Sequence, residues 1–235
     1  MDGPRSPRRH RTPSRTAGRA PDNTCRDARE RMVEYQLIAR GIRDPYVLAA
    51  MRTVPREAFV PTAQAAAAYD DAPLPIGEEQ TISQPYIVAY MLEALELASG
   101  ERVLDIGTGS GYAAALLAEM GCTVVSIERL AGLAAAASAR LHALGYDAVR
   151  VVVGDGSAGW AAGAPWDAIV AAAGAPRVPA QLREQLAVGG RLLLPIGDQR
   201  NLQALERIRR ESAHGFVSER LLDVRFVPLV GTAGW

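Results

Sequence analysis

Lysine is absent from this chain of 235 residues, so all 26 of its basic residues are arginines. A GC-rich coding bias accounts for such a composition, and the absence also excludes a P-loop, whose lysine binds nucleotide phosphates. The arginines balance 26 acidic residues, yet residues 1–20 contain six arginines and only one acid. That segment carries a net charge of +5 and the other 215 residues carry −5, so we expect no nucleic-acid partner for the folded part.

Residues that bind metals or form disulfides are also scarce. The two cysteines, Cys25 and Cys122, form no C-x-x-C motif, and the three histidines are scattered without an H-E-x-x-H motif. This spacing fits neither a disulfide framework nor a zinc site, and it is typical of the reducing cytoplasm. No apolar run reaches the length of a membrane span. We therefore expect a cytoplasmic protein that binds no metal and no membrane.

Length and composition predict one α/β domain with a short additional part. Hydrophobic residues make up 49% of the chain, which is enough to form one sizeable core. Residues 1–24 are rich in proline, serine, arginine and glycine, and we expect them to be disordered because they offer little apolar surface to bury. We expect residues 25–98 to form an N-terminal helical lobe with an active-site loop, and residues 99–235 to form a cofactor-binding domain with C-terminal strands.

The N-terminal lobe contains three predicted helices. Residues 27–39 place apolar side chains on one stripe, and Gly41 follows where a helix C-cap belongs. Asp44 is followed by a proline. Asp44 is the expected N-cap of a second helix, and the proline is expected at its first position. Residues 54–80 are interrupted by prolines and predict an ordered loop. Ser83 is expected to cap a third helix that ends near residue 98.

The rest of the chain alternates between strand and helix patterns. Such alternation predicts a doubly wound, mostly parallel sheet of the Rossmann-like type. An antiparallel pair of strands at 202–210 and 216–227 is expected to complete it. The other predicted strands are 102–106, 123–128, 148–154, 166–173 and 191–197, and the predicted helices are 111–120, 130–144 and 179–187.

A glycine-rich turn follows the first of these strands. Gly107, Gly109 and Gly111 form a G-x-G-x-G pattern, which differs from the dinucleotide pattern G-x-G-x-x-G because position 112 is Tyr112. Asp105, just before the first glycine, would repel a pyrophosphate but suits a sulfonium and an amino group. The pattern therefore counts against NAD and FAD, although by itself it also fits a simple tight turn.

Two further acids follow the next two strands. Glu128 ends the second strand, where nucleotide-binding folds place an acid that binds the ribose hydroxyls. Asp155, with Gly156 after it, ends the third strand and could accept a hydrogen bond from an adenine amino group, although turn chemistry alone also explains it. Carboxyl ends of neighbouring parallel strands share one edge, where such folds bind ligands. Together with Asp105, these acids predict a site for S-adenosyl-L-methionine.

A distinctive string, Q-T-I-S-Q-P, stands at residues 80–85 and is preceded by Y-D-D-A-P-L-P-I-G at 69–77. Further short strings are G-D-G at 154–156, G-W at 159–160, G-G-R-L at 189–192 and F-V-P-L at 226–229. With these strings, the chain resembles the protein-L-isoaspartate(D-aspartate) O-methyltransferase family over about residues 28–235. The resemblance implies a methyltransferase fold and transfer of a methyl group from S-adenosyl-L-methionine to the free carboxylate of L-isoaspartyl or D-aspartyl residues in damaged proteins and peptides.

The resemblance also implies roles for individual residues. Ser83 matches the family's active-site serine, although the cap of the following helix is an alternative role that can hold at the same time. Glu79 departs from the family pattern, which usually has glycine before the glutamine, and we expect it to stiffen the loop without abolishing the site. The residues expected to bind or border the cofactor are Gln80, Thr81, Ile82, Asp105, Gly107, Gly109, Gly111, Glu128, Asp155, Gly156 and Val230.

Three functions are compatible with these patterns. Repair of isoaspartyl proteins or peptides is favoured because no extra substrate-recognition domain follows residue 230. The first alternative is a relative that methylates one aspartate of a dedicated peptide precursor. The second is a non-catalytic regulator tethered by the arginine-rich segment, which an intact loop at Ser83 argues against. We expect the protein to be a monomer.

Overall fold

The computed structural model describes residues 23–198 and 202–235. The predicted disordered segment therefore lies outside the described residues, except for its last two positions. These two belong to helix α1 (Asn23–Met32), so the prediction that the tail extends to residue 24 was wrong. The helix begins earlier than expected because no proline or glycine follows Pro21 until Gly41.

The lobe that α1 begins follows the predicted helical pattern. From α1 the chain continues through a π-helical turn (Val33–Leu37) and a 3₁₀ turn (Ile38–Arg40), and it ends at Gly41 with a left-handed φ of 101°. Helix α2 (Pro45–Thr53) is capped as predicted. The Asp44 carboxylate accepts from the backbone N–H groups of the first turn at 2.8 and 3.1 Å. Two 3₁₀ turns follow, η3 (Arg56–Phe59) and η4 (Thr62–Ala67).

A β-hairpin occupies part of the segment that was predicted as a loop. Strands β1 (Leu74–Gly77) and β2 (Gln80–Ile82) pair antiparallel around a turn of two residues. Those residues, Glu78 and Glu79, both have left-handed φ angles, 51° and 57°. Two-residue hairpin turns of this kind usually contain asparagine or glycine. Glutamate at both positions therefore gives no signal for the turn in the sequence.

Helix α3 (Pro85–Ala94) corrects the prediction that Ser83 caps it. The N-cap residue is Gln84, and no local side chain accepts from the first turn. Instead the Asp71 carboxylate, from a distant part of the chain, accepts from the Tyr86 N–H at 3.1 Å. The helix also ends before the predicted residue 98, because Glu96 adopts a left-handed φ of 50°.

The predicted doubly wound sheet is present, with seven strands in the order β5-β4-β3-β6-β7-β8-β9. Strands β3 to β7 run parallel, whereas β8 and β9 are antiparallel and complete one edge as predicted. The third strand, β5, is shorter than predicted, and β7 is longer because it continues through Gly189 and Gly190. The strands are β3 (Arg102–Ile106), β4 (Thr123–Glu128), β5 (Arg150–Val153), β6 (Trp166–Ala171), β7 (Leu186–Ile196), β8 (Gln203–Arg210) and β9 (Phe216–Val224).

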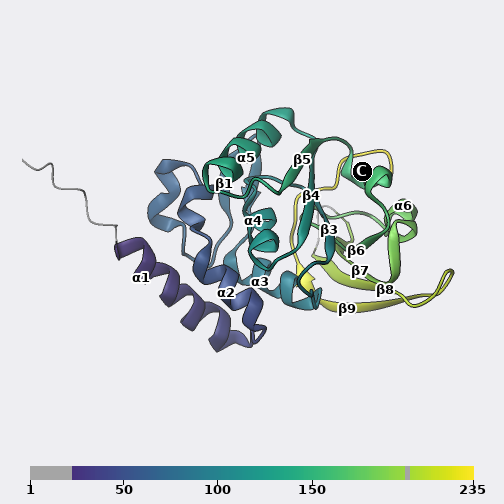
Figure 1. Ribbon diagram of the computed structural model, residues 1–235, viewed down its shortest axis with the longest axis horizontal. Helices are drawn as coiled ribbons and strands as arrows, with labels where there is room; N and C mark the ends of the chain where they lie inside the picture. The colour runs from purple at the N-terminus through teal and green to yellow at the C-terminus, as the bar shows by residue number, and fades with distance from the viewer. Residues whose placement is uncertain (1–22, 199–201) are drawn as a thin grey trace, which may run out of the picture.

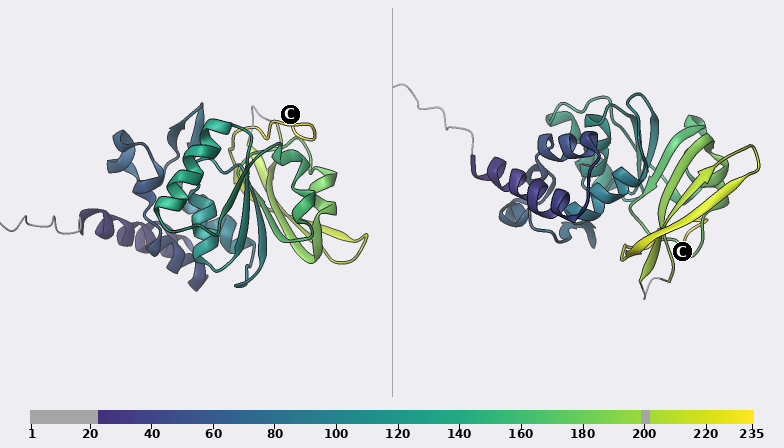
Figure 2. Two further views of the ribbon diagram at one scale, coloured as in Figure 1. Left: turned by 45° about the horizontal axis from the view of Figure 1, so that its top comes forward. Right: turned by 90° about the horizontal axis from the view of Figure 1, so that it is seen from below.

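Alternate residues of the sheet bury against two layers. One face packs on the helical lobe, on α4 (Tyr112–Glu119) and on α5 (Ala131–Ala143), and the other packs on α6 (Ala180–Glu184). In β3, Val103 belongs to the first core and Leu104 to the second, as the two-residue period of a strand requires. Figures 1 and 2 show the helical lobe on one side and β8 and β9 on the other. Among the described residues, no helix has the length and apolar character needed to span a membrane.

The hairpin turn leads to a first prediction about stability. Glu79→Gly should raise the free energy of unfolding by about 1 kcal/mol, because the left-handed conformation costs residues with a Cβ atom roughly that amount. Urea unfolding followed by circular dichroism measures the change. Glu211→Gly is the control: its φ is not left-handed, so glycine there should lower stability. A loss of stability in both variants would contradict the strain assigned to the turn.

Candidate active site

The site lies where the strand order reverses. From β3 the chain proceeds to β4 and β5 on one side, whereas β6 and β7 lie on the other. The segments that leave β3 and β6 therefore diverge, and ligands of doubly wound folds bind in the crevice between them. After β6, Ala172 still donates to the Ile106 carbonyl at 2.9 Å, which sets the floor of this crevice.

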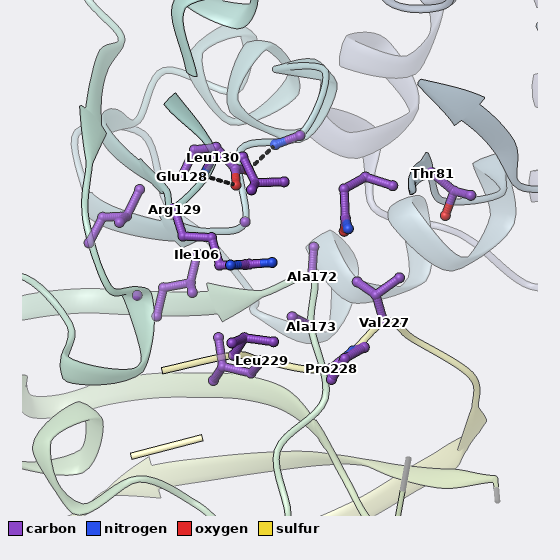
Figure 3. Close-up of a pocket in the computed structure, with 16 residues that line it drawn as sticks. Thr81, Ile106, Glu128, Arg129, Leu130, Ala172, Ala173, Val227, Pro228 and Leu229 are labelled. Atoms are coloured by element: carbon purple, nitrogen blue, oxygen red, sulfur yellow. Dashed lines mark hydrogen bonds between the residues drawn. The ribbon is translucent and has the colours of Figure 1, made fainter. Parts of the chain in front are cut away.

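Three cavities lie at the crevice, namely two hollows and a groove. The first hollow is lined by Gln80, Thr81, Ile106, Gly107, Gly109, Ile127, Glu128, Arg129, Leu130, Gly156, Ala172, Ala173 and residues 227–230 (Figure 3). The second hollow is lined by residues 81–83, Val88, Met91, Leu92, Asp105, residues 107–110, Tyr112, Ala113, Val170, Ala172 and Phe226. The groove, of about 720 Å³, is lined by Arg40, Pro73, Thr81, residues 83, 84, 86 and 87, Ala172, Leu202 and residues 222–227.

The three glycines of the turn have different tasks. Gly107 and Gly109 line both hollows, and all three glycines have left-handed φ angles of 92°, 52° and 91° in chain order. Gly111 lines neither hollow. A Cβ atom there would lie 3.3 Å from the Leu141 side chain, so this glycine allows α4 to pack closely against α5. Of the three predicted cofactor contacts, the structure brings Gly107 and Gly109 to the crevice.

Asp105 is buried at the wall of the second hollow, with 1% of its surface exposed. Its Oδ2 accepts from the Ser126 hydroxyl at 2.7 Å, and Ser126 shares a further hydrogen bond of 2.6 Å with Thr108. Its Oδ1 has no hydrogen-bond partner in the part of the chain that the structure describes. Burial raises the pKa of Asp105 to about 7, with the Glu128 charge adding to the rise and the Ser126 hydrogen bond opposing it. A buried, unsatisfied carboxylate oxygen fits a ligand that carries a positive charge.

Glu128 lines the first hollow and also fastens the turn (Figure 3). Its Oε2 accepts from the Gly109 N–H at 2.9 Å, and its Oε1 accepts from the Leu130 N–H at 3.0 Å. The carboxylate is thus held at the tip of β4, and each oxygen retains a lone pair for a further donor. This geometry suits two adjacent ribose hydroxyls. Arg129 extends into the same hollow, although the sequence analysis did not assign it.

Asp155 does not line the hollow directly. One carboxylate oxygen accepts from the N–H and hydroxyl of Ser157 at 2.9 and 2.6 Å, and the other from the N–H and hydroxyl of Thr232 at 2.8 and 2.9 Å. Burial alone would raise the pKa of Asp155, but these hydrogen bonds outweigh it and hold the pKa below its ordinary value. The neighbouring Gly156 does line the first hollow.

The C-terminal segment crosses the first hollow, and Asp155 holds it there. We call residues 226–235 the C-terminal strap. Residues 227–230 of the strap line the hollow, so Val230 lies where it was predicted. The strap is anchored by Gly174, whose N–H donates to the Val227 carbonyl at 2.8 Å and whose carbonyl accepts from Leu229 at 2.7 Å. Trp235 also donates to the Gly174 carbonyl through its indole N–H, at 3.0 Å.

The hairpin supplies the opposite wall. Gln80 and Thr81 line the first hollow, Ile82 lines the second, and Ser83 lines both the second hollow and the groove. Within the described ranges 23–198 and 202–235, the Ser83 hydroxyl has no hydrogen-bond partner, whereas its carbonyl accepts from Arg56 at 2.9 Å. Thr81 and Ala172 line all three cavities, so the two hollows and the groove meet at this pair.

Other wall residues were missed because no local pattern marks them. Ala172 and Ala173 continue an alanine-rich strand, and residues 227–229 are an apolar stretch near the end of the chain that was not assigned to the site. Their position follows from the sheet reversal and the strap, both of which are tertiary features. Arg129 carried the only usable signal, since it directly follows the predicted ribose-binding acid.

This combination defines a class of protein. A doubly wound sheet, a G-x-G-x-G turn, an acid at the tip of the second strand and a buried carboxylate suited to a positively charged ligand are features of S-adenosylmethionine-dependent methyltransferases. The model of one such family, "Protein-L-isoaspartate(D-aspartate) O-methyltransferase", matches residues 27–234. The chain belongs to this family.

Individual relatives agree with the family match. The chain is 60% identical over 207 residues to protein-L-isoaspartate O-methyltransferase 1 of Rhodopseudomonas palustris, a match that covers 88% of this chain and 84% of the relative. It is 59% identical over 209 residues to protein-L-isoaspartate O-methyltransferase 1 of Geotalea uraniireducens, with 89% and 95% covered.

Solved structures resemble this fold over most of its length. A protein-L-isoaspartate O-methyltransferase superposes with a TM-score of 0.78 at 31% identity, covering 88% of this chain and 67% of that one. A second structure, described as such an enzyme from Plasmodium falciparum in complex with S-adenosyl-L-homocysteine, gives a TM-score of 0.73 at 26% identity, with 86% and 96% covered.

The raised pKa of Asp105 predicts a pH dependence of cofactor binding. Because a bound sulfonium and ammonium favour the ionised carboxylate, the affinity for S-adenosylmethionine should rise between about pH 5.5 and 7.5 and then level off. The stability of the free protein should change in the opposite direction. Because the pKa of Asp105 is higher in the folded than in the unfolded state, its protonation stabilises the fold, fully so below about pH 4. This contribution is lost as the pH rises through 7.

Calorimetric titrations with S-adenosylmethionine across this pH range measure the first effect. Asp105→Asn cannot ionise, so its affinity should be low and independent of pH. Asp147→Asn, at an exposed position outside the hollows, is the matched control and should keep the wild-type profile. A pH-dependent affinity that persists in Asp105→Asn would show that another group is responsible.

The strap leads to a further prediction. Thr232→Val keeps the shape of the side chain but removes its hydrogen bond to Asp155, so S-adenosylmethionine should bind about fivefold more weakly. Thr53→Val is the control, since the Thr53 hydroxyl bonds only within α2 at the Ala49 carbonyl. Equal affinity of wild type and Thr232→Val in the same calorimetric assay would mean that the strap does not depend on this contact.

Proposed function

We propose that this chain transfers a methyl group from S-adenosylmethionine to the free carboxylate of L-isoaspartyl and D-aspartyl residues in damaged proteins and peptides, with Ser83 orienting the acceptor. The observation that carries the proposal is the meeting of the two hollows and the groove at Thr81 and Ala172. A cofactor and an extended peptide can therefore reach the same point from different sides. The family match supports the choice of substrate.

The residues of both hollows fit S-adenosylmethionine. Glu128 would bind the ribose hydroxyls, and Gly156, Arg129 and the strap would enclose the adenine. The unsatisfied Oδ1 of Asp105 would accept from the ammonium group. When bound, the cofactor supplies a methyl group activated by its sulfonium. Asp155 contributes in this arrangement by holding the strap in place.

The acceptor needs no general base. A peptide carboxyl group has a pKa near ~4 and is ionised at neutral pH. This accounts for a site whose lining contains no histidine and whose Ser83 has a free hydroxyl. That hydroxyl donates a hydrogen bond that aims one carboxylate oxygen at the meeting point, so catalysis rests mainly on placement.

The wall of the second hollow also favours the reaction by limiting water. Ile82, Val88 and Leu92 are buried apolar residues at its surface. Because the reaction consumes a negative and a positive charge, a site with little water stabilises the transition state relative to the separated ions. Ser83 balances this effect, since a single hydroxyl orients the anion without binding it too tightly.

The alternatives are less well supported. A non-catalytic regulator would not need a serine at the position where the second hollow and the groove share a lining residue. A dedicated peptide precursor would use the same chemistry, but the family match and the relatives favour general repair. We infer that the protein acts as a monomer in the cytoplasm without nucleic acid, in line with its cysteines, which form no C-x-x-C motif, and with its charge distribution.

Paired peptides test the proposal directly. The protein should methylate an isoaspartyl peptide and leave its L-aspartyl twin almost unmodified, because the extra backbone methylene moves the carboxylate into line with the methyl group. Incorporation of label from tritiated S-adenosylmethionine measures both rates. Equal methylation of the two peptides would contradict a repair function.

Ser83 can be tested in the same assay. Ser83→Ala should lower kcat about tenfold while the affinity for S-adenosylmethionine stays within about twofold, because the hydroxyl orients the acceptor. Ser138→Ala, at an exposed position on α5, is the control. A Ser83→Ala enzyme with wild-type turnover would remove Ser83 from the mechanism.

A further inference from the structure

Arg56 is a fully buried guanidinium next to the acceptor site, with 0% of its surface exposed. Its Nε donates to the Ala68 carbonyl at 2.7 Å, and its Nη2 donates to the Ser83 carbonyl at 2.9 Å. Its Nη1 is buried and has no hydrogen-bond partner. Within the described part of the chain it forms no ion pair. Arg56 therefore carries a charge into the interior without a carboxylate to balance it.

Another buried arginine of this fold does have a negatively charged partner. Arg191 is 7% exposed, and its Nη2 pairs with Glu101 at 2.7 Å. The groups that face Arg56 are instead the Tyr112 ring, 5.1 Å from the guanidinium carbon, with Tyr69 and Asp71 further away. Asp71 is engaged by Arg40 and by the N-terminus of α3. Burial lowers the pKa of Arg56, because the buried guanidinium has lost its surrounding water and no close carboxylate compensates for that loss.

The two carbonyls that Arg56 binds belong to two different segments of the chain. Ala68 immediately precedes the Y-D-D segment, whose Asp71 accepts from the first turn of α3, and Ser83 lies between β2 and α3. By binding the Ser83 carbonyl, Arg56 fixes the backbone of a residue that lines the second hollow and the groove. Tyr112, which Arg56 also contacts, lines the second hollow.

We propose that Arg56 is the positioning residue of the methyl acceptor: it holds Ser83 in place, and its uncompensated positive charge favours the acceptor as a carboxylate over the acceptor as an ester. The proposal rests on the proposed function. Arg56 lines none of the three cavities, so its charge acts on the acceptor carboxylate across Ser83 and Tyr112, which do line them.

The preference for the carboxylate over the ester also promotes release of the methylated product. A carboxylate oxygen forms the bond to the methyl group, the sulfur–methyl bond breaks, and its electron pair remains on sulfur. The sulfonium and the carboxylate thereby become a neutral thioether and a neutral ester. Since the ester no longer carries the negative charge that Arg56 attracts, it binds more weakly than the substrate from which it formed.

Two substitutions separate the two tasks of Arg56. Arg56→Gln keeps an amide donor for the Ser83 carbonyl but removes the charge. Arg56→Lys keeps the charge but cannot span both carbonyls with its single ammonium group. Arg52→Gln is the matched control, because Arg52 lies in the same lobe and pairs with Glu30 and Glu34 away from the groove. Melting temperatures of all variants are recorded alongside.

The measurements are kcat, KM and the affinities for an isoaspartyl peptide and for its methyl ester, the last two by calorimetry with S-adenosylhomocysteine present. Arg56→Gln should bind the acid about tenfold more weakly and the ester unchanged, and its kcat should fall by less than its affinity for the acid. Arg56→Lys should keep the preference for the acid, and its kcat should fall about tenfold. Arg52→Gln should match the wild type.

An undiminished preference for the acid in Arg56→Gln would overturn the proposal, and so would a lost preference in Arg56→Lys. If only one of the two variants folds, its own outcome decides. A parallel fall of acid and ester affinity in both variants would assign Arg56 a purely structural role. Failure of the proposed function is a separate result, since it would appear in the wild type as equal methylation of isoaspartyl and aspartyl peptides.

Discussion

The site depends on the reversal of strand order between β3 and β6. Because the chain moves to opposite sides after these two strands, their carboxyl ends separate and leave a crevice that neither can fill. The glycine turn lies on one side of the crevice and Ala172 on the other. The hairpin and the C-terminal strap cover this crevice from two further directions, so their role depends on the crevice being there.

Charge is distributed around the crevice in an unusual way. Asp105 is a buried carboxylate with one unsatisfied oxygen, and Arg56 is a buried guanidinium with one unsatisfied nitrogen. Asp105 lines the second hollow, and Arg56 bonds to Ser83 and contacts Tyr112, which both line it as well. Buried charges are costly unless they are paired. Among the described residues neither group forms an ion pair, and the reactants of the proposed function carry groups of the opposite charge.

The walls of the site come from segments that are far apart in the chain. Thr81 belongs to the hairpin that precedes the sheet, whereas Val227 and Val230 lie after its last strand. The strap is held by Asp155 and Gly174 rather than by residues near it in sequence.

The sequence by itself determined the fold class, the cofactor class and the main acids. Strand–helix alternation, the spacing of Gly107 and Gly109, and the acids that follow two successive strands are local patterns, and parallel strands bring their ends together by geometry alone. The cap at Asp44 was likewise predictable because donor and acceptor are neighbours in the chain. Ser83 was identified through a distinctive string, not through its environment.

The tertiary structure decided what depends on contacts between distant residues. It supplied the cap of α3 from Asp71 rather than from Ser83, it placed two glutamates in a hairpin turn, and it engaged Asp155 with the strap. It also left one guanidinium nitrogen of Arg56 without a hydrogen-bond partner among the described residues. None of these has a local signal, because hydrogen bonding and burial depend on which segments meet in space, and the sequence pattern of one segment carries no information about the other.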